Sequence, residues 1–103
     1  MVITMSEEYY IIAQKYGECI DYLKSMLEVT TYEVSNSTDD SIIELKKISF
    51  IETDDMFKAS IIIRVSVKED INKIIKILTN HKYSNIIITK TIKIIDSNGD
   101  EHD

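Results

Sequence analysis

The chain has 103 residues and a mass of 11.9 kDa, which fits one domain. Hydrophobic residues make up 44% and charged residues 29% of the sequence, proportions that exclude a disordered chain. No apolar run reaches the roughly 20 residues of a membrane span, and a single cysteine excludes an intrachain disulfide. Because no signal peptide precedes Ser6, we expect a cytoplasmic protein.

The net charge of −6 conceals an uneven distribution along the chain. Residues 1–55 carry 12 acids and 4 lysines, whereas residues 56–95 carry 2 acids and 8 bases. The last eight residues add four acids. The middle segment is therefore basic within an acidic protein, so an anionic binding partner remains a hypothesis despite the negative net charge.

Isoleucine occurs 21 times and leucine four times. Isoleucine, lysine and asparagine have A/T-rich codons, so the bias is typical of an AT-rich genome such as that of a phage, a virus or a mobile element. The excess of β-branched side chains also favours a sheet.

A first helix is predicted from Ser6 to Glu28. Ser6 is a suitable N-cap, and apolar residues then recur at steps of three and four, the spacing of one helical face. These residues are Tyr9, Ile12, Tyr16, Cys19, Leu23 and Met26. Cys19 is expected to be buried on this face, and Gly17 is a candidate kink. Residues 29–34 are β-branched and aromatic, and they predict a short strand.

Two adjacent strands follow. Residues 42–51 change their apolar parity at Lys46-Lys47, which indicates a β-bulge, and Thr53-Asp54-Asp55 forms a turn. Residues 57–67 alternate between apolar and polar side chains, the signal of a strand with one buried face.

A second helix is expected from about Glu69 to Asn80, capped from Ser66, with Ile71, Ile74, Ile75 and Leu78 facing inward. Residues 86–95 form the last strand. Lys90 falls within its apolar face, and we expect it to reach solvent because the strand is longer than the helix that covers it.

These elements predict an α+β protein, with residues 1–95 as one domain and residues 96–103 as an acidic C-terminal tail. The preferred arrangement is a mainly antiparallel four-stranded sheet with two helices on one face, in the order α-βββ-α-β. A ferredoxin-like βαββαβ order is the alternative. It requires a strand near residues 2–5 and no strand at residues 29–34.

Catalytic chemistry finds no support in the sequence. The two histidines, His81 and His102, lie in no nucleophilic arrangement, and no glycine-rich phosphate loop occurs. Asp96-x-Asn98-x-Asp100 lacks the glycine and the final glutamate of a calcium loop. We therefore expect no enzyme, no cofactor and no metal.

Two surfaces are candidates for binding. Lys58, Arg64, Lys68 and Lys93 form a candidate face for an anionic partner, but no aromatic residue is expected there to stack on bases. Ile11, Tyr22 and Ile62 are apolar residues expected at the surface, and they form a candidate self-association surface.

We therefore expect a small non-enzymatic protein-binding module, such as an adaptor, an escort or an inhibitor, that acts as a homodimer. A nucleic-acid-binding regulator that uses the basic sheet face is one alternative. A small-ligand sensor domain is another, and it rests on fold analogy alone.

Overall fold

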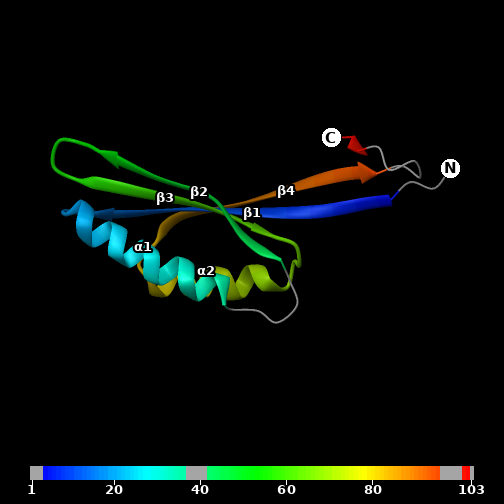
Figure 1. The fold of residues 1–103 in the computed structure, drawn as a ribbon, viewed down its shortest axis with the longest axis horizontal. Coiled ribbons are helices and arrows are strands. Elements are labelled where there is room, and N and C mark those ends of the chain that lie inside the picture. Colours follow the sequence, from blue (N-terminus) through cyan, green and yellow to red (C-terminus); the bar gives the residue numbers. More distant parts are fainter. Residues whose placement is uncertain (1–3, 37–41, 96–100, 103) are drawn as a thin grey trace.

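The computed structural model describes residues 4–36, 42–95 and 101–102. Its elements, in chain order, are β1 (Thr4–Gly17), α1 (Ile20–Ser35), β2 (Ile43–Glu52), β3 (Phe57–Val65), α2 (Asp70–Asn80), β4 (Ser84–Ile95) and β5 (Glu101–His102). The strands form one sheet in the order β2-β3-β1-β4-β5, and every neighbouring pair is antiparallel. Both helices lie on one side of this sheet (Figure 1).

The α+β class is confirmed, and the βαββαβ order is that of the ferredoxin-like alternative. The preferred α-βββ-α-β order is wrong in its first third. Residues 4–17 form a strand instead of a helix, and residues 29–34 belong to α1 instead of a strand. Residues 1–3 lie outside the described residues.

The incorrect prediction of a helix over residues 6–17 has a physical cause in β1. Its helix-side residues Tyr9, Ile11 and Ala13 are buried, but the opposite face also carries large apolar residues, Tyr10 and Ile12. With apolar residues on both faces, the period of two disappears from the sequence, and steps of three and four can be read through the strand into the next helix.

Tertiary packing explains why residues 29–34 are helical. Leu23, Leu27, Thr30 and Val34 are spaced as one helical stripe, and all four are buried. The Thr30 hydroxyl donates a hydrogen bond of 2.9 Å to the Met26 carbonyl, which satisfies it inside the helix. Burial of this stripe outweighs the β-propensity of the β-branched residues.

The rest of the chain follows its predicted elements. The register between β2 and β3 shifts between Leu45 and Lys47, which confirms the bulge. Inward-facing residues of α2 are buried as expected, except that Ile75 is half-buried. Ser66 does not cap α2, because its hydroxyl accepts the Ile42 amide and the N-cap residue is Glu69. Within the predicted tail, residues 101–102 pair with β4, and residues 96–100 and 103 lie outside the described residues.

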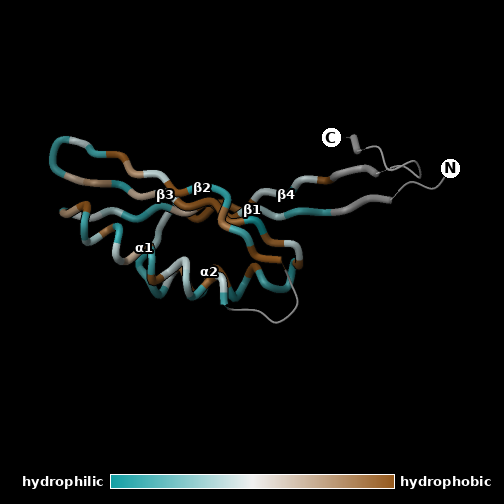
Figure 2. The backbone as a smooth tube through the Cα atoms, in the orientation of Figure 1, coloured by the Kyte–Doolittle hydropathy of each residue, from teal (hydrophilic) through white to brown (hydrophobic). Residues whose placement is uncertain are grey.

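The core lies between the sheet and the helices. Its largest fully buried side chains come from β1, β3 and both helices, and they are Ile11, Leu23, Ile61, Ile63, Ile74 and Leu78. Figure 2 shows the most hydrophobic backbone stretches where the strands cross beside the helices. Beyond the helices, β1 and β4 continue as a pair to Thr4 and Ile95 (Figure 1).

Gly17 ends β1 beside the core, and a larger residue there should destabilise the fold. A Cβ atom on Gly17 would lie 2.9 Å from Cδ2 of Leu23, whose side chain is fully buried. We expect Gly17→Ala to lower the free energy of unfolding by about 1–3 kcal/mol through overpacking, measured by urea denaturation. Ser25→Ala on the exposed side of α1 is the control and should change it by less than about 0.5 kcal/mol. Equal stability of Gly17→Ala and the wild type would contradict this packing.

Cys19 is exposed at the start of α1, which corrects the expectation of a buried thiol. A thiol reagent should therefore label the native protein nearly as fast as the urea-unfolded chain, because access does not limit the reaction. Labelling that is slower by about a hundredfold or more in the native state would contradict this exposure.

Candidate protein-binding surface

The face of the sheet opposite the helices carries an apolar row that crosses three strands. Ile62 of β3 pairs with Ile12 of β1, and Ile12 pairs with Ile87 of β4. Ile12 and Ile62 are half-buried, and Ile87 is 54% exposed. No described helix covers this side of the sheet (Figure 1). We call it the open face and the three residues the isoleucine row.

A charged group flanks the isoleucine row on one side. Arg64 Nη1 lies 2.7 Å from Glu8 Oε1, and Arg64 Nε lies 3.1 Å from Glu44 Oε2. The Tyr10 hydroxyl donates a 3.0 Å hydrogen bond to the other oxygen of Glu8. Two carboxylates therefore surround the guanidinium, and this part of the open face is not a concentration of positive charge.

The four predicted cations do not share one surface. Lys58 and Arg64 lie on the open face of β3, but Lys68 lines a groove on the helix side. Lys93 pairs with Ser6 in the register of β1 and β4, and its side chain lies outside the described residues. The predicted anionic-partner face is thus divided between the two sides of the sheet.

The predicted self-association residues are also separated. Ile11 is fully buried in the core, so its assignment to a surface is wrong. Tyr22 is 54% exposed on α1, on the opposite side of the sheet from Ile62. The residues missing from the prediction were Ile12 and Tyr10, which share the open face with Ile62. Assigning β1 to a strand is the signal that would have found them.

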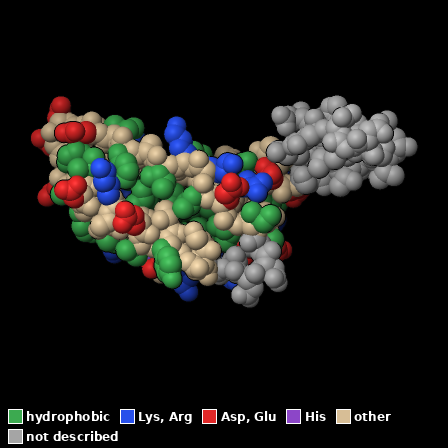
Figure 3. All heavy atoms as spheres, in the orientation of Figure 1, with side chains coloured by type: hydrophobic (Ala, Val, Ile, Leu, Met, Phe, Trp, Pro, Cys, Tyr) green, Lys and Arg blue, Asp and Glu red, His purple; other side chains and the backbone are tan. Residues whose placement is uncertain are grey.

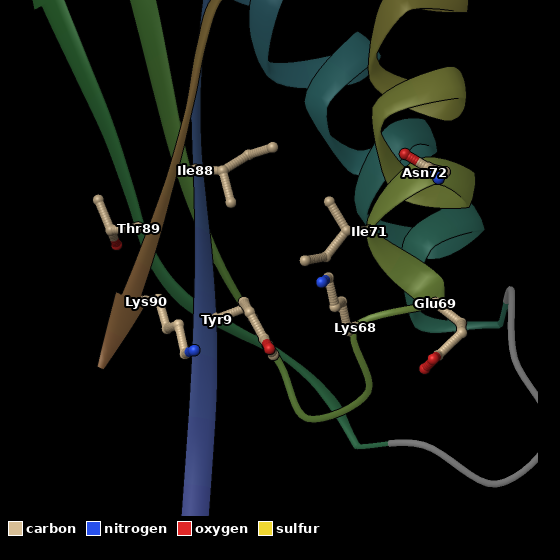
Figure 4. A pocket seen from close by; sticks show the side chains of 8 residues that line it. All are labelled: Tyr9, Lys68, Glu69, Ile71, Asn72, Ile88, Thr89 and Lys90. Atoms are coloured by element: carbon tan, nitrogen blue, oxygen red, sulfur yellow. The ribbon is translucent and has the colours of Figure 1, made fainter. Parts of the chain in front are cut away.

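A groove on the helix side lies between β4 and the start of α2. Its volume is about 490 Å³, and it is lined by Tyr9, Lys68, Glu69, Ile71, Asn72, Ile88, Thr89 and Lys90. Figure 4 shows Ile88 and Ile71 pointing toward each other across it.

Lys90 lies at one end of this groove. Its Nζ is 2.8 Å from Glu7 Oε1, and the side chains of both residues are 47% exposed, which confirms that Lys90 reaches solvent. The hydrogen bond between them lowers the pKa of Glu7 and raises the pKa of Lys90.

Lys15 is the buried cation of the described residues, with 3% of its surface exposed. Its ammonium donates to the backbone carbonyl of His81, just past the end of α2, and lies 5.5 Å from the centre of the Tyr83 ring. Both the carbonyl end of the helix and the ring face attract a cation. His81 in turn contacts Glu33 of α1, with Nε2 2.9 Å from Oε2. This cluster joins β1 to both helices.

The described residues offer little for other classes of site. No group of three or more histidine, cysteine, aspartate or glutamate side chains is arranged among them to hold a metal ion. Over the same residues, neither helix has the length and apolarity to cross a membrane.

Comparison with known proteins identifies the fold and no family. No protein-family model matches the chain, and no curated protein matches its sequence. The designed protein Foldit4 is similar in structure, with a TM-score of 0.56, 14% identity and coverage of 84% of this chain and 96% of that chain.

Two further solved structures are also similar. LarC2, the C-terminal domain of a cyclometallase involved in the synthesis of the NPN cofactor of lactate racemase, has a TM-score of 0.58 and 8% identity, and the match covers 86% of this chain and 57% of that one. The designed protein LFR1 1 with ferredoxin fold has a TM-score of 0.47 and 14% identity, and the match covers 84% of each chain. At these identities, the likeness to Foldit4 and LarC2 shows the fold alone.

The burial of Lys15 makes a prediction for the pH dependence of stability. Burial lowers the pKa of Lys15 from its ordinary value of 10.5. As the pH rises toward 10.5, the folded state releases this proton before the unfolded state does, so the unfolded state binds more protons and stability increases. The free energy of unfolding of the wild type should therefore rise relative to that of Lys15→Met as the pH approaches 10.5 from below.

Urea denaturation at a series of pH values measures this difference. A flat difference between the wild type and Lys15→Met over this range would contradict the assignment of a buried lysine.

Proposed function

We propose that the protein is a non-enzymatic protein-binding module that forms a homodimer through the open face of its sheet. The observation that carries the proposal is the isoleucine row on a face that no described element covers. An apolar centre surrounded by polar and charged side chains is the usual anatomy of a protein interface.

A second copy suits this face because the face complements itself. If two sheets pack about a two-fold axis parallel to the isoleucine row, each isoleucine meets its own copy. The same rotation carries the side of the face with Glu8, Arg64 and Glu44 over the side with Lys58, because Lys58 lies on the other side of the row in the register. A group of two carboxylates and one cation then faces Lys58 at the rim.

The dimensions of the open face fit a modest dimer. Nine residues along each of four strands outline about 30 Å by 19 Å, or about 570 Å². Side-chain relief makes the accessible area larger than this flat outline, and a standard interface buries about 800 Å² of each partner. The open face is therefore about as large as one side of a standard interface.

A nucleic-acid partner is less consistent with the contacts of Arg64. Its charge is balanced by Glu8 and Glu44, and the face presents the acids as well as the base. Phosphate binding relies on uncompensated lysine and arginine.

The dimer is tested by light scattering coupled to size-exclusion chromatography. The wild type should give about twice 11.9 kDa at micromolar concentration. Ile62→Glu and Ile87→Glu should each give the monomer mass, because two copies of a carboxylate would face each other in the apolar row. Circular dichroism confirms that each variant is folded; Ile87, at 54% exposure, tolerates the change best.

Tyr32→Ser is the matched control, since Tyr32 is an apolar residue 71% exposed on α1. It should remain dimeric. A wild type that is monomeric at about 100 µM, or a dimer lost in Tyr32→Ser and kept in Ile62→Glu, would overturn the proposal.

A further inference from the structure

The outer edge of β4 offers backbone groups for pairing. β4 pairs with β1 along its inner edge, and among the described residues its outer edge pairs with β5 only at Ile94 and Ile95. Residues 86–92 contain no proline and a single charged residue, Lys90. Such an edge is a template for another strand. The outer edge of β2 is less suitable, because its bulge at residues 45–47 interrupts the register and two lysines lie there.

The groove described above runs beside this edge. Ile88 on the helix side of β4 is 47% exposed, and Ile71 of α2 faces it (Figure 4). A strand added to β4 would lie about 4.8 Å from it, with alternate side chains on the helix side. Those side chains would pack beside Ile88 and under α2. Backbone pairing and side-chain recognition are thus available together, as β-strand addition requires.

The charge around the groove indicates the chemistry of the added strand. Lys68 and Lys90 line the groove together with Glu69, and Lys90 is paired with Glu7, so Lys68 is the cation there that an acidic strand can meet. Acidic side chains gather at the end of the molecule where β2 turns into β3 and α1 begins, away from this edge (Figure 3). An acidic side chain on the added strand would meet the opposite charge of Lys68.

We propose that the outer edge of β4 binds an extended acidic peptide segment of a partner protein, which joins the sheet as a further strand. Its apolar residues lie over the groove beside Ile88, and its acidic residues meet Lys68. Within the protein itself, Glu101 and His102 of the acidic C-terminal segment pair with the end of this edge as β5, which is an intramolecular example of such pairing. This site is separate from the open face and does not depend on dimerisation.

The test titrates the full-length protein, labelled with ¹⁵N, with an eight-residue peptide that alternates glutamate and valine. We expect saturable binding, with shifted and exchange-protected amides concentrated in residues 86–92. A peptide that alternates lysine and valine should bind at least about tenfold more weakly. A glutamate–valine peptide methylated on alternate backbone nitrogens should lose binding, because it cannot complete the strand pairing.

Matched variants test whether the peptide binds at the groove. Ile88→Ser should weaken binding by about fivefold to tenfold through lost apolar contact. Ile51→Ser, at an equally exposed isoleucine on β2, should leave it unchanged; the exposures are 47% and 48%. Lys68→Glu should weaken binding, and Lys58→Glu on the open face should not.

Three results would overturn the proposal: no saturation by about 1 mM peptide, equal binding of the methylated peptide, or shifts centred on β2 or the open face. Ile62→Glu should bind the peptide as the wild type does. Failure of the peptide site is therefore distinguishable from failure of the dimer.

Discussion

The fold depends on β1 having a hydrogen-bonded strand on each edge. Residues 9–17 pair with β3, and residues 4–14 pair with β4. Because β1 is central, each helix connects two parallel strands that are separated by a third: α1 joins β1 to β2, and α2 joins β3 to β4. Right-handed crossovers from antiparallel strands place both helices on the same face. One face is therefore covered, and no described helix or strand covers the other.

How much of this could be predicted from the sequence depends on whether local pattern and tertiary burial agree. In β3 and α2 they agree, since alternate residues of β3 are buried and the buried residues of α2 follow one helical stripe. The bulge of β2 was also predictable. Ile43 and Leu45 precede it, Ile48 and Phe50 follow it, and both pairs can lie on the core side only if the register shifts between them. In β1 and α1 they disagree. β1 carries apolar residues on both faces, so its sequence lacks the alternation of a strand. Thr30 and Val34 are β-branched but helical, because α1 buries them against the core.

The candidate site was harder to predict than the fold for the same reason. Ile62 was identified from the alternation of β3, but its partner in the row, Ile12, could not be placed without the strand assignment of β1. The pairing of Arg64 with Glu8 joins residues 56 positions apart. Nothing in the spacing of either residue indicates such a contact, and it changes a predicted basic patch into a balanced one.

The two proposed surfaces use different parts of the same sheet, and this follows from its geometry. The open face presents side chains along the sheet normal, whereas the β4 edge presents backbone groups within the sheet plane. The helices cover the other face incompletely, because α2 spans 11 residues and β4 spans 12, and a residue rises about 1.5 Å in a helix but about 3.3 Å in a strand. This mismatch leaves Ile88 and Lys90 exposed beside the edge. Charge then separates the two surfaces further: carboxylates and cations share the open face, so it can meet its own copy, whereas Lys68 beside β4 favours an acidic strand.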